Sequence, residues 1–259
     1  MSKHAVVSKD EWIAARKQLL LKEKELTKMR EQLSQQIREM PWIKVEKEYF
    51  FDTLTGKVSL SELFDGRNQL IVKHFMMAPG QTEGCVGCSF EVDQTEGALK
   101  HLQHHDVTYV AVARAPIDAI EAFKKRMGWG FRWVSSCGSD FNYDFYASFK
   151  PEDAESGKAF YNYEFAKVPL EDLSGRSVFY KDENGDIYLT YSSFARGMEE
   201  LLGAYVMLDV TPNGRNEKGP NHNLTDWVRH HDRYGAVGHV ANTGRWVAGE
   251  ESPCCKGKH

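Results

Sequence analysis

The sequence predicts an α/β fold in which a central mixed sheet lies between layers of helices, giving three layers in all. Two almost continuously apolar runs, residues 69–77 and 107–113, have the composition of strands covered on both faces. Each run is followed by a helical pattern, and this alternation indicates right-handed crossovers between strands. A later hairpin, with strands at 177–180 and 187–191, adds antiparallel strands to the sheet.

A helical arm, residues 1–41, is predicted to precede the main domain. Residues 9–40 contain no Gly or Pro, and Pro41 ends the helical pattern. Two interpretations stay open: an amphipathic arm packed on its own domain, and an arm that pairs with a second copy in a homodimer. The second rests on apolar residues that recur every seven positions, as in a coiled-coil seam, at Trp12, Leu19, Leu26, Leu33 and Met40.

The main domain is expected to span residues 42–210, and a docked or loose C-terminal tail to span 211–259. Apolar periodicity defines the elements, and turn residues separate them. In chain order we expect a strand at 44–51, a turn at 53–57, an apolar stretch at 58–64, the strand at 69–77, a helix from Cys85 to about His105, the strand at 107–113, a helix from Pro116 to Met127, a short strand at 133–136, an aromatic stretch at 141–145, a polar irregular region at 146–175, the hairpin and a helix at 198–207.

Composition excludes several classes of protein. The hydrophobic fraction of 41% suits a globular core, and a net charge of −4 gives no basic surface for nucleic acid. No stretch approaches the roughly 20 apolar residues that a membrane span needs, and no signal-peptide core is evident. We therefore expect a cytoplasmic protein. Five cysteines do not suit a secreted disulfide framework, so paired cysteines point to catalysis or metal binding.

The pair Cys85 and Cys88 lies where a buried strand hands over to a helix. A helix N-terminus carries unpaired N–H groups and the positive end of a dipole, which stabilise a thiolate. Cys85, at the helix start, is the expected attacking thiol, and Cys88 the resolving thiol. Arg114 follows the strand 107–113 directly. It can approach Cys85 and favour its thiolate, hold an anionic substrate, or cap local carbonyl groups at the surface.

A metal site is the alternative use of the same pair. Cys85 and Cys88, together with His230 or His231 from a folded-back tail, would suit copper or zinc, and Cu(I) prefers soft thiolates. The redox interpretation requires no cofactor.

Three further cysteines lie outside the pair. Cys137 is interpreted as a small buried residue, with a resolving role as the alternative. Cys254 and Cys255 are adjacent in the polar tail, where they are expected to be peripheral.

Several long motifs carry a resemblance to a known family, and they lie at residues 83–90, 113–116, 123–129, 139–145, 177–180, 191–197 and 227–234. They make the chain similar to the bacterial thioredoxin-like family known as domain of unknown function 899. The resemblance runs from about Trp12 to Tyr234 and implies a thioredoxin fold, but no established activity. In thioredoxins a cis-proline precedes the strand that faces the two thiols, whereas the corresponding residues 174–177 here contain no proline.

The expected function is thiol–disulfide oxidoreduction by Cys85 and Cys88, acting on a small thiol, disulfide or peroxide, or on a specific redox partner protein. A peroxiredoxin-like peroxidase, in which Cys85 forms a sulfenic acid, is a further alternative. The loop before Cys85 lacks the proline-and-threonine lead-in that peroxiredoxins place there. A non-catalytic interaction module built on the long helix is the remaining alternative.

Overall fold

The structure is a computed structural model that describes residues 4–249. The chain divides into two compact units, and the boundary lies between Trp42 and Ile43. The first unit contains helix α1 (Lys9–Arg38), as predicted. Ser8 caps it, because the Ser8 hydroxyl accepts from the N–H of Glu11 while the Glu11 carboxylate accepts from Ser8. The apolar residues at seven-residue spacing lie on the surface of this unit. The homodimer stays a prediction.

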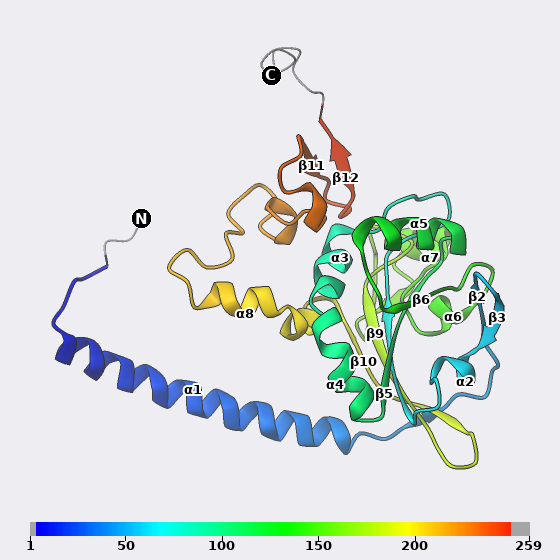
Figure 1. Ribbon diagram of the computed structural model, residues 1–259, viewed down its shortest axis with the longest axis horizontal. Coiled ribbons are helices and arrows are strands. Elements are labelled where there is room, and N and C mark those ends of the chain that lie inside the picture. Colours follow the sequence, from blue (N-terminus) through cyan, green and yellow to red (C-terminus); the bar gives the residue numbers. More distant parts are fainter. Residues whose placement is uncertain (1–3, 250–259) are drawn as a thin grey trace. The chain divides into compact units, whose positions relative to one another are not determined.

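The second unit contains an eight-stranded, curled sheet with helices against it (Figure 1). The strand order is β1-β10-β9-β4-β5-β6-β2-β3. The strands are β1 (Ile43–Lys44), β2 (Phe50–Thr53), β3 (Gly56–Ser59), β4 (Gln69–His74), β5 (Val107–Ala113), β6 (Arg132–Ser135), β9 (Gly175–Lys181) and β10 (Ile187–Phe194). The helices nearest the sheet are α2 (Leu60–Leu63), α3 (Val86–Asp93), α4 (Leu99–His104), α5 (Ile117–Met127) and α6 (Phe141–Asp144).

The centre of the sheet has the thioredoxin arrangement. β4 and β5 run parallel, β9 is antiparallel to β4, and β10 is antiparallel to β9. The thiol-bearing helix α3 is the next element after β4 along the chain. After α4, the chain returns to the sheet as β5, which is the order of a parallel crossover unit. The predicted fold class is therefore confirmed.

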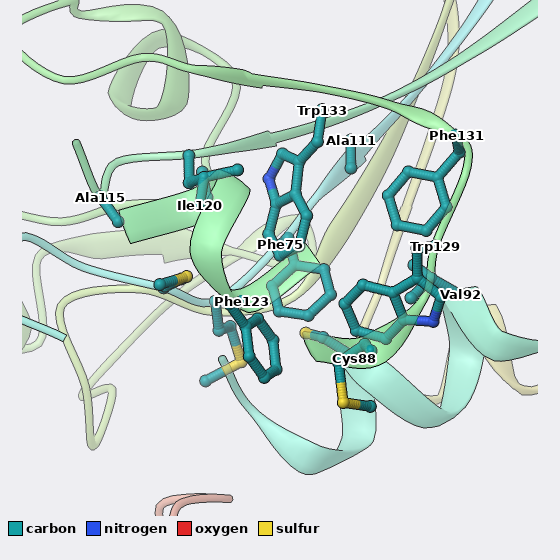
Figure 2. Packing of buried hydrophobic residues seen from close by; sticks show 14 of the residues in the cluster. Phe75, Cys88, Val92, Ala111, Ala115, Ile120, Phe123, Trp129, Phe131 and Trp133 are labelled. Carbon is teal, nitrogen blue, oxygen red and sulfur yellow. The ribbon is translucent and has the colours of Figure 1, made fainter. Parts of the chain in front are cut away.

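The two faces of the sheet have separate cores, because successive side chains of a strand point to opposite faces. On one face, Ala111 and Trp133 pack against α3 and α5 through Val92, Ile120 and Phe123 (Figure 2). The opposite face is covered by α2 and α6. Its buried residues include Leu63, Leu70, Val72, Val110, Val112, Val134, Phe141, Phe145 and Phe179. Helices, sheet and helices thus form three layers.

One sequence prediction near the start of this unit was wrong. The strand expected at 44–51 is split, since β1 pairs with β10 at one edge and β2 pairs with β3 and β6 elsewhere in the sheet. The intervening charges have partners off the sheet: Lys47 pairs with Asp140 and Asp144. The stretch 58–64 ends as α2, because Ser59 and Glu62 form a capping box.

The helix predicted from Cys85 to His105 is interrupted. α3 ends at Asp93, a 3₁₀ turn spans Glu96–Ala98, and α4 completes the segment. Gln94 marks the break, because its side chain donates to the carbonyl of Phe90 and accepts from the N–H of Ala204. Side chains that bond neighbouring backbone groups compete with helix continuation. The thiol helix is therefore only two turns long and ends against a distant part of the chain.

The region predicted to be irregular, 146–175, contains helix α7 (Pro151–Ser156) and a small hairpin of β7 (Ala159–Tyr161) and β8 (Glu164–Ala166). Pro151 occupies the first helical turn, where its missing N–H is not needed. The helix expected at 198–207 is a 3₁₀ helix, Ala195–Leu201, followed by α8 (Gly203–Asp209).

Residues 203–249, hereafter the C-terminal segment, pack against α3. After α8 they form 3₁₀ turns at Leu224–Asp226 and His231–Arg233 and a hairpin of β11 (Gly238–Val240) and β12 (Trp246–Ala248). Phe90 of α3 contacts the rings of Tyr205 and Trp227. One hydrophobic cluster therefore joins α3 to this segment, and it contains Val86, Phe90, Leu202, Tyr205, Val228 and Val240.

None of the helices within residues 4–249 combines the length and the apolar character needed to cross a membrane.

Candidate functional site

Cys85 is the N-cap residue of α3, with extended backbone angles of φ −60° and ψ 136°. Its N–H donates to the carbonyl of Met76 (3.0 Å), which ties it to the end of β4. Its own carbonyl accepts from the backbone and hydroxyl of Ser89 (3.0 and 2.9 Å). A Cβ added to Gly84 would overlap the Phe75 ring, so only glycine lets the chain enter the helix here. The sequence prediction of a thiol at the helix start agrees with this geometry.

The Cys85 thiol is acidic because hydrogen bonds converge on its sulfur. The Cys88 thiol donates to it, and this contact lowers the pKa of Cys85 most, to about 6. Burial acts in the opposite direction, whereas the backbone N–H groups of Cys88 and Gly87 and the charge of Arg245 lower the pKa further. These two N–H groups belong to the first turn of α3, which has no intrahelical acceptor for them.

Cys88 has the opposite character. Its side chain is 2% exposed and lies among the aromatic rings of Phe75, Phe123 and Trp129 (Figure 2). Burial raises the pKa of Cys88 well above its usual range, and the neighbouring Cys85 sulfur raises it further. At neutral pH the pair therefore holds one proton, on Cys88.

A buried ion pair lies behind Cys88. Lys73 points inward from β4 and is 1% exposed, and its ammonium group contacts the carboxylate of Glu91 from α3. The Ser174 hydroxyl bridges the two sites, at 2.6 Å from Lys73 Nζ and 3.5 Å from Cys88 Sγ. Because Lys73 donates to the Ser174 oxygen, the hydroxyl proton of Ser174 is available to a sulfur anion at Cys88.

Ser174 lies immediately before β9, in the stretch 174–177 where the sequence lacks the proline expected from thioredoxins. The hydroxyl oxygen of Ser174 accepts from the Cys88 thiol. Tyr161 holds the Ser174 backbone by donating to its carbonyl (2.9 Å).

Part of the C-terminal segment covers Cys85. The carbonyl of Gly244 accepts from the N–H of Val86 (2.9 Å), and a Cβ added to Gly244 would lie 2.6 Å from Cys85 Sγ. Arg245 donates to the carbonyls of Met76 (3.2 Å) and Glu83 (3.1 Å). Both carbonyls belong to the loop that carries Cys85, so Arg245 holds this loop and places a positive charge beside the sulfur.

His230 and His231 lie near the thiol segment, but their ring nitrogens have other partners. Burial lowers the pKa of His230, so the ring is neutral; its Nε2 donates to the carbonyl of Gly84 (3.0 Å), and its Nδ1 accepts from Arg126 (2.9 Å). His231 Nδ1 lies 2.7 Å from Asp93. Among residues 4–249, no cluster of three or more His, Cys, Asp or Glu side chains is arranged to hold a metal ion.

Arg114 lies at the end of β5, as predicted, where it binds acidic and phenolic groups. Its Nε donates to Asp172 (2.6 Å) and its Nη1 to the hydroxyl of Tyr143 (2.6 Å). Asp172 also accepts from Ser148 (2.6 Å) and is two residues before Ser174. Arg114 therefore anchors the segment that carries Ser174, while Arg245 is the arginine whose charge acts on Cys85.

The two sulfurs border a cavity of about 450 Å³. Cys85 is 7% exposed, so the cavity is its route to solvent. The walls come from the end of β4, α3, the segment 169–174, the 3₁₀ helix before α8 and the C-terminal segment. The volume of this cavity lies within the usual range for small-molecule sites.

Sequence reasoning missed several residues of this site. Lys73 carried a usable signal, because it interrupts an apolar run that otherwise reads as a buried strand. Gly244 and Arg245 carried none, since their contacts join segments about 160 residues apart. The interpretation of Cys137 as buried was wrong, because that thiol is exposed after β6. Cys254 and Cys255 lie outside the described residues.

Residues 1–234 match a bacterial family described as "Bacterial protein of unknown function (DUF899)". The chain belongs to this family. The family match includes both thiols, Lys73 and His230, and ends before Gly244 and Arg245. No curated protein matches the sequence.

Solved structures with similar folds include two proteins from Mycobacterium tuberculosis and one from Xylella fastidiosa. The peroxidoxin BcpB of M. tuberculosis is 12% identical with a TM-score of 0.41, over 63% of this chain and 91% of its own. X. fastidiosa PrxQ is 12% identical with a TM-score of 0.39, over 62% of this chain and 89% of its own. A secreted disulfide oxidoreductase of M. tuberculosis is 14% identical with a TM-score of 0.33, over 62% of this chain and 96% of its own. The assignment of the fold of this DUF899 member rests on the strand order of its own sheet, given above.

Proposed function

We propose that this protein is a thiol–disulfide oxidoreductase in which Cys85 and Cys88 cycle between a dithiol and a disulfide. The observation that supports this most is the contrast within the pair: hydrogen bonds lower the pKa of Cys85 to about 6, whereas burial raises that of Cys88. A thiolate is the attacking form of a cysteine, so the pair has one nucleophile and one protonated partner at neutral pH.

In the first step the Cys85 thiolate attacks a disulfide RSSR. The S–S bond of the substrate breaks, RS⁻ leaves, and Cys85 forms a mixed disulfide with the remaining RS group. Cys88 then loses its proton, which the departing RS⁻ or solvent accepts. The Cys88 thiolate attacks Cys85 Sγ and releases the second RS⁻. Two electrons pass from the pair to the substrate, and an external dithiol must return them for a further cycle.

Lys73 and Ser174 favour the second step. Once Cys85 is in a mixed disulfide, its sulfur no longer accepts the proton of Cys88, and Cys88 becomes a buried anion. The Ser174 hydroxyl, 3.5 Å from Cys88, can donate to that anion while its own oxygen accepts from Lys73. The positive charge of Lys73 also acts on Cys88 to lower its pKa.

The shape of the site supports a small substrate. Both sulfurs are less than a tenth exposed, and Gly244 covers one side of Cys85. A folded protein partner needs an exposed surface around the attacking sulfur, whereas a small disulfide needs only the cavity.

The test is an equilibrium titration of the purified protein against mixtures of reduced and oxidised dithiothreitol, with the Cys85–Cys88 disulfide counted by acid trapping and mass spectrometry. We expect one two-electron transition in the wild type and none in Cys85→Ser or Cys88→Ser. Cys137→Ser is the matched control, because this thiol is exposed and distant from the pair in sequence, and it should leave the transition unchanged. A wild-type protein whose pair stays reduced throughout the titration would contradict the proposal.

A further inference from the structure

The cavity beside the thiols has apolar walls. The side chains of its walls include Met76, Leu170, Leu173, Met198, Leu202 and Leu224, which come from four different parts of the chain. Apolar walls bind apolar substituents by removing them from water, at about 25 cal/mol per Å² of buried surface. A substrate that fills this space therefore gains affinity from hydrocarbon groups on either side of its reactive bond.

Each carboxylate that lines the cavity has a hydrogen-bond or ion-pair partner. Glu91 contacts Lys73, and Glu217 accepts from the hydroxyl of Tyr205. Glu199 pairs with Arg215 (2.9 Å) and with Arg196 (2.9 Å). Among the lining residues that the structure describes, the basic side chains are Arg196, which is 84% exposed, and His222.

This distribution disfavours anionic substrates. Three carboxylates, one arginine and one histidine line the space, and the arginine already has a carboxylate partner. A carboxylate brought in with the substrate would lose its hydration without gaining a cation, and burying an unpaired charge is costly. Glutathione-like disulfides, which carry several carboxylates, fit such a site poorly.

We propose that the cavity selects small, uncharged disulfides with apolar substituents as the substrates of Cys85. This inference rests on the proposed thiol–disulfide function and names its substrate class. The reaction balances as above: RSSR takes up two electrons from the pair, one proton from Cys88 and one from solvent and leaves as two RSH, while the protein forms the Cys85–Cys88 disulfide.

The experiment compares three symmetrical disulfides of similar size: dipropyl disulfide, which is neutral, 3,3′-dithiodipropionate, which is dianionic, and cystamine, which is dicationic. Fully reduced protein is mixed with each, the reaction is quenched in acid, and the Cys85–Cys88 disulfide is counted by mass spectrometry. Each rate constant is divided by that of 2-mercaptoethanol thiolate with the same disulfide, which removes intrinsic reactivity.

We expect the normalised rate for dipropyl disulfide to exceed that for the dianion at least about tenfold, because the dianion must be desolvated in the cavity. Equal normalised rates for the three probes, or a preference for the dianion, would overturn the substrate class. Either result would leave the proposed function standing. Failure of all three probes to oxidise the pair would count against the function itself, and the dithiothreitol titration would show the same failure.

Leu170 provides a test by charge insertion. It is half-buried on the cavity wall, so a lysine or a glutamate can be placed there with its charged end towards solvent. We expect Leu170→Lys to raise the rate for 3,3′-dithiodipropionate relative to dipropyl disulfide several-fold, and Leu170→Glu to lower it. Leu170→Gln controls for the loss of the apolar side chain. If lysine and glutamate leave this ratio at the glutamine value, the substrates do not pass through the cavity and the inference is wrong.

Discussion

The two sides of the site differ in how they are built. On one side, β4 and α3 carry both sulfurs, and regular hydrogen bonding, close packing and the buried pair of Lys73 and Glu91 hold them. On the other side, the C-terminal segment reaches Cys85 through a few single contacts, such as those of Gly244 and Arg245. The first side sets the contrast in pKa between the two thiols, whereas the second lowers the pKa of Cys85 further and limits its exposure.

Replacing Lys73 should produce the largest effect, on the side of β4 and α3. Lys73→Met leaves the Glu91 carboxylate buried without its cation, and removing one partner of a buried ion pair costs about 3–5 kcal/mol. Urea unfolding of the reduced protein measures this loss in the free energy of unfolding.

The double variant Lys73→Met with Glu91→Leu is the control, because it removes both charges and should recover most of the stability. If the single variant is as stable as the wild type, Glu91 finds another partner. The buried pair would then not be what distinguishes the side formed by β4 and α3.

Gly244→Ala should produce an intermediate effect, on the side of the C-terminal segment. The new Cβ would lie 2.6 Å from Cys85 Sγ, so the sulfur or the turn must move. The backbone φ of +75° adds a strain of about 1–2 kcal/mol for any residue other than glycine. We expect Cys85 to be alkylated more slowly by iodoacetamide at pH 7, because its sulfur is less accessible.

Gly214→Ala is the matched control for strain. Gly214 lies in the same segment at φ +61°, but a Cβ there meets no atom within 4 Å. It should cost similar stability while the alkylation rate of Cys85 stays at the wild-type value. Equal rates in the two variants would contradict the contact between Gly244 and the sulfur.

Arg245→Gln should produce the smallest effect. The wild-type alkylation rate of Cys85 should be constant well above pH 6 and fall about tenfold per pH unit well below it, because only the thiolate reacts. Without the charge of Arg245 the thiolate is less stable, so the pKa of Cys85 and the midpoint of this profile should rise by up to about one unit.

Arg229→Gln is the comparison variant for Arg245. Arg229 lies in the same segment, over the ring of Trp246, and donates to the carbonyl of Val228; it is not among the main influences on the pKa of Cys85. Its profile should match the wild type. A midpoint that stays near pH 6 in Arg245→Gln would show that the helix terminus and Cys88 set the acidity of Cys85 unaided.

The sequence predicts the side of the site formed by β4 and α3 better than the side formed by the C-terminal segment. The strands of β4 and β5 and the thiols at the start of α3 were evident, because burial on both faces of a sheet leaves an apolar run and a helix start leaves a turn-rich loop. Local pattern also indicated α1 and α5. These elements need little information from elsewhere in the chain.

The remaining features depend on contacts between distant residues. Gln94 ends α3 by bonding Ala204, and the same residue in another context would continue a helix. Arg114 was a reasonable candidate for the cation near Cys85, yet Asp172 and Tyr143 bind it, and Arg245 holds the thiol loop instead. Which arginine approaches the sulfur is decided by how the C-terminal segment packs, and no local pattern encodes that.

The family match ends at residue 234, before Gly244 and Arg245. The stretch that carries the two thiols and the stretch that covers Cys85 lie far apart in the sequence, and a hydrophobic cluster, ion pairs and hydrogen bonds join them. Substitutions in residues 235–249 can therefore alter access to Cys85 while the residues that carry both sulfurs stay unchanged.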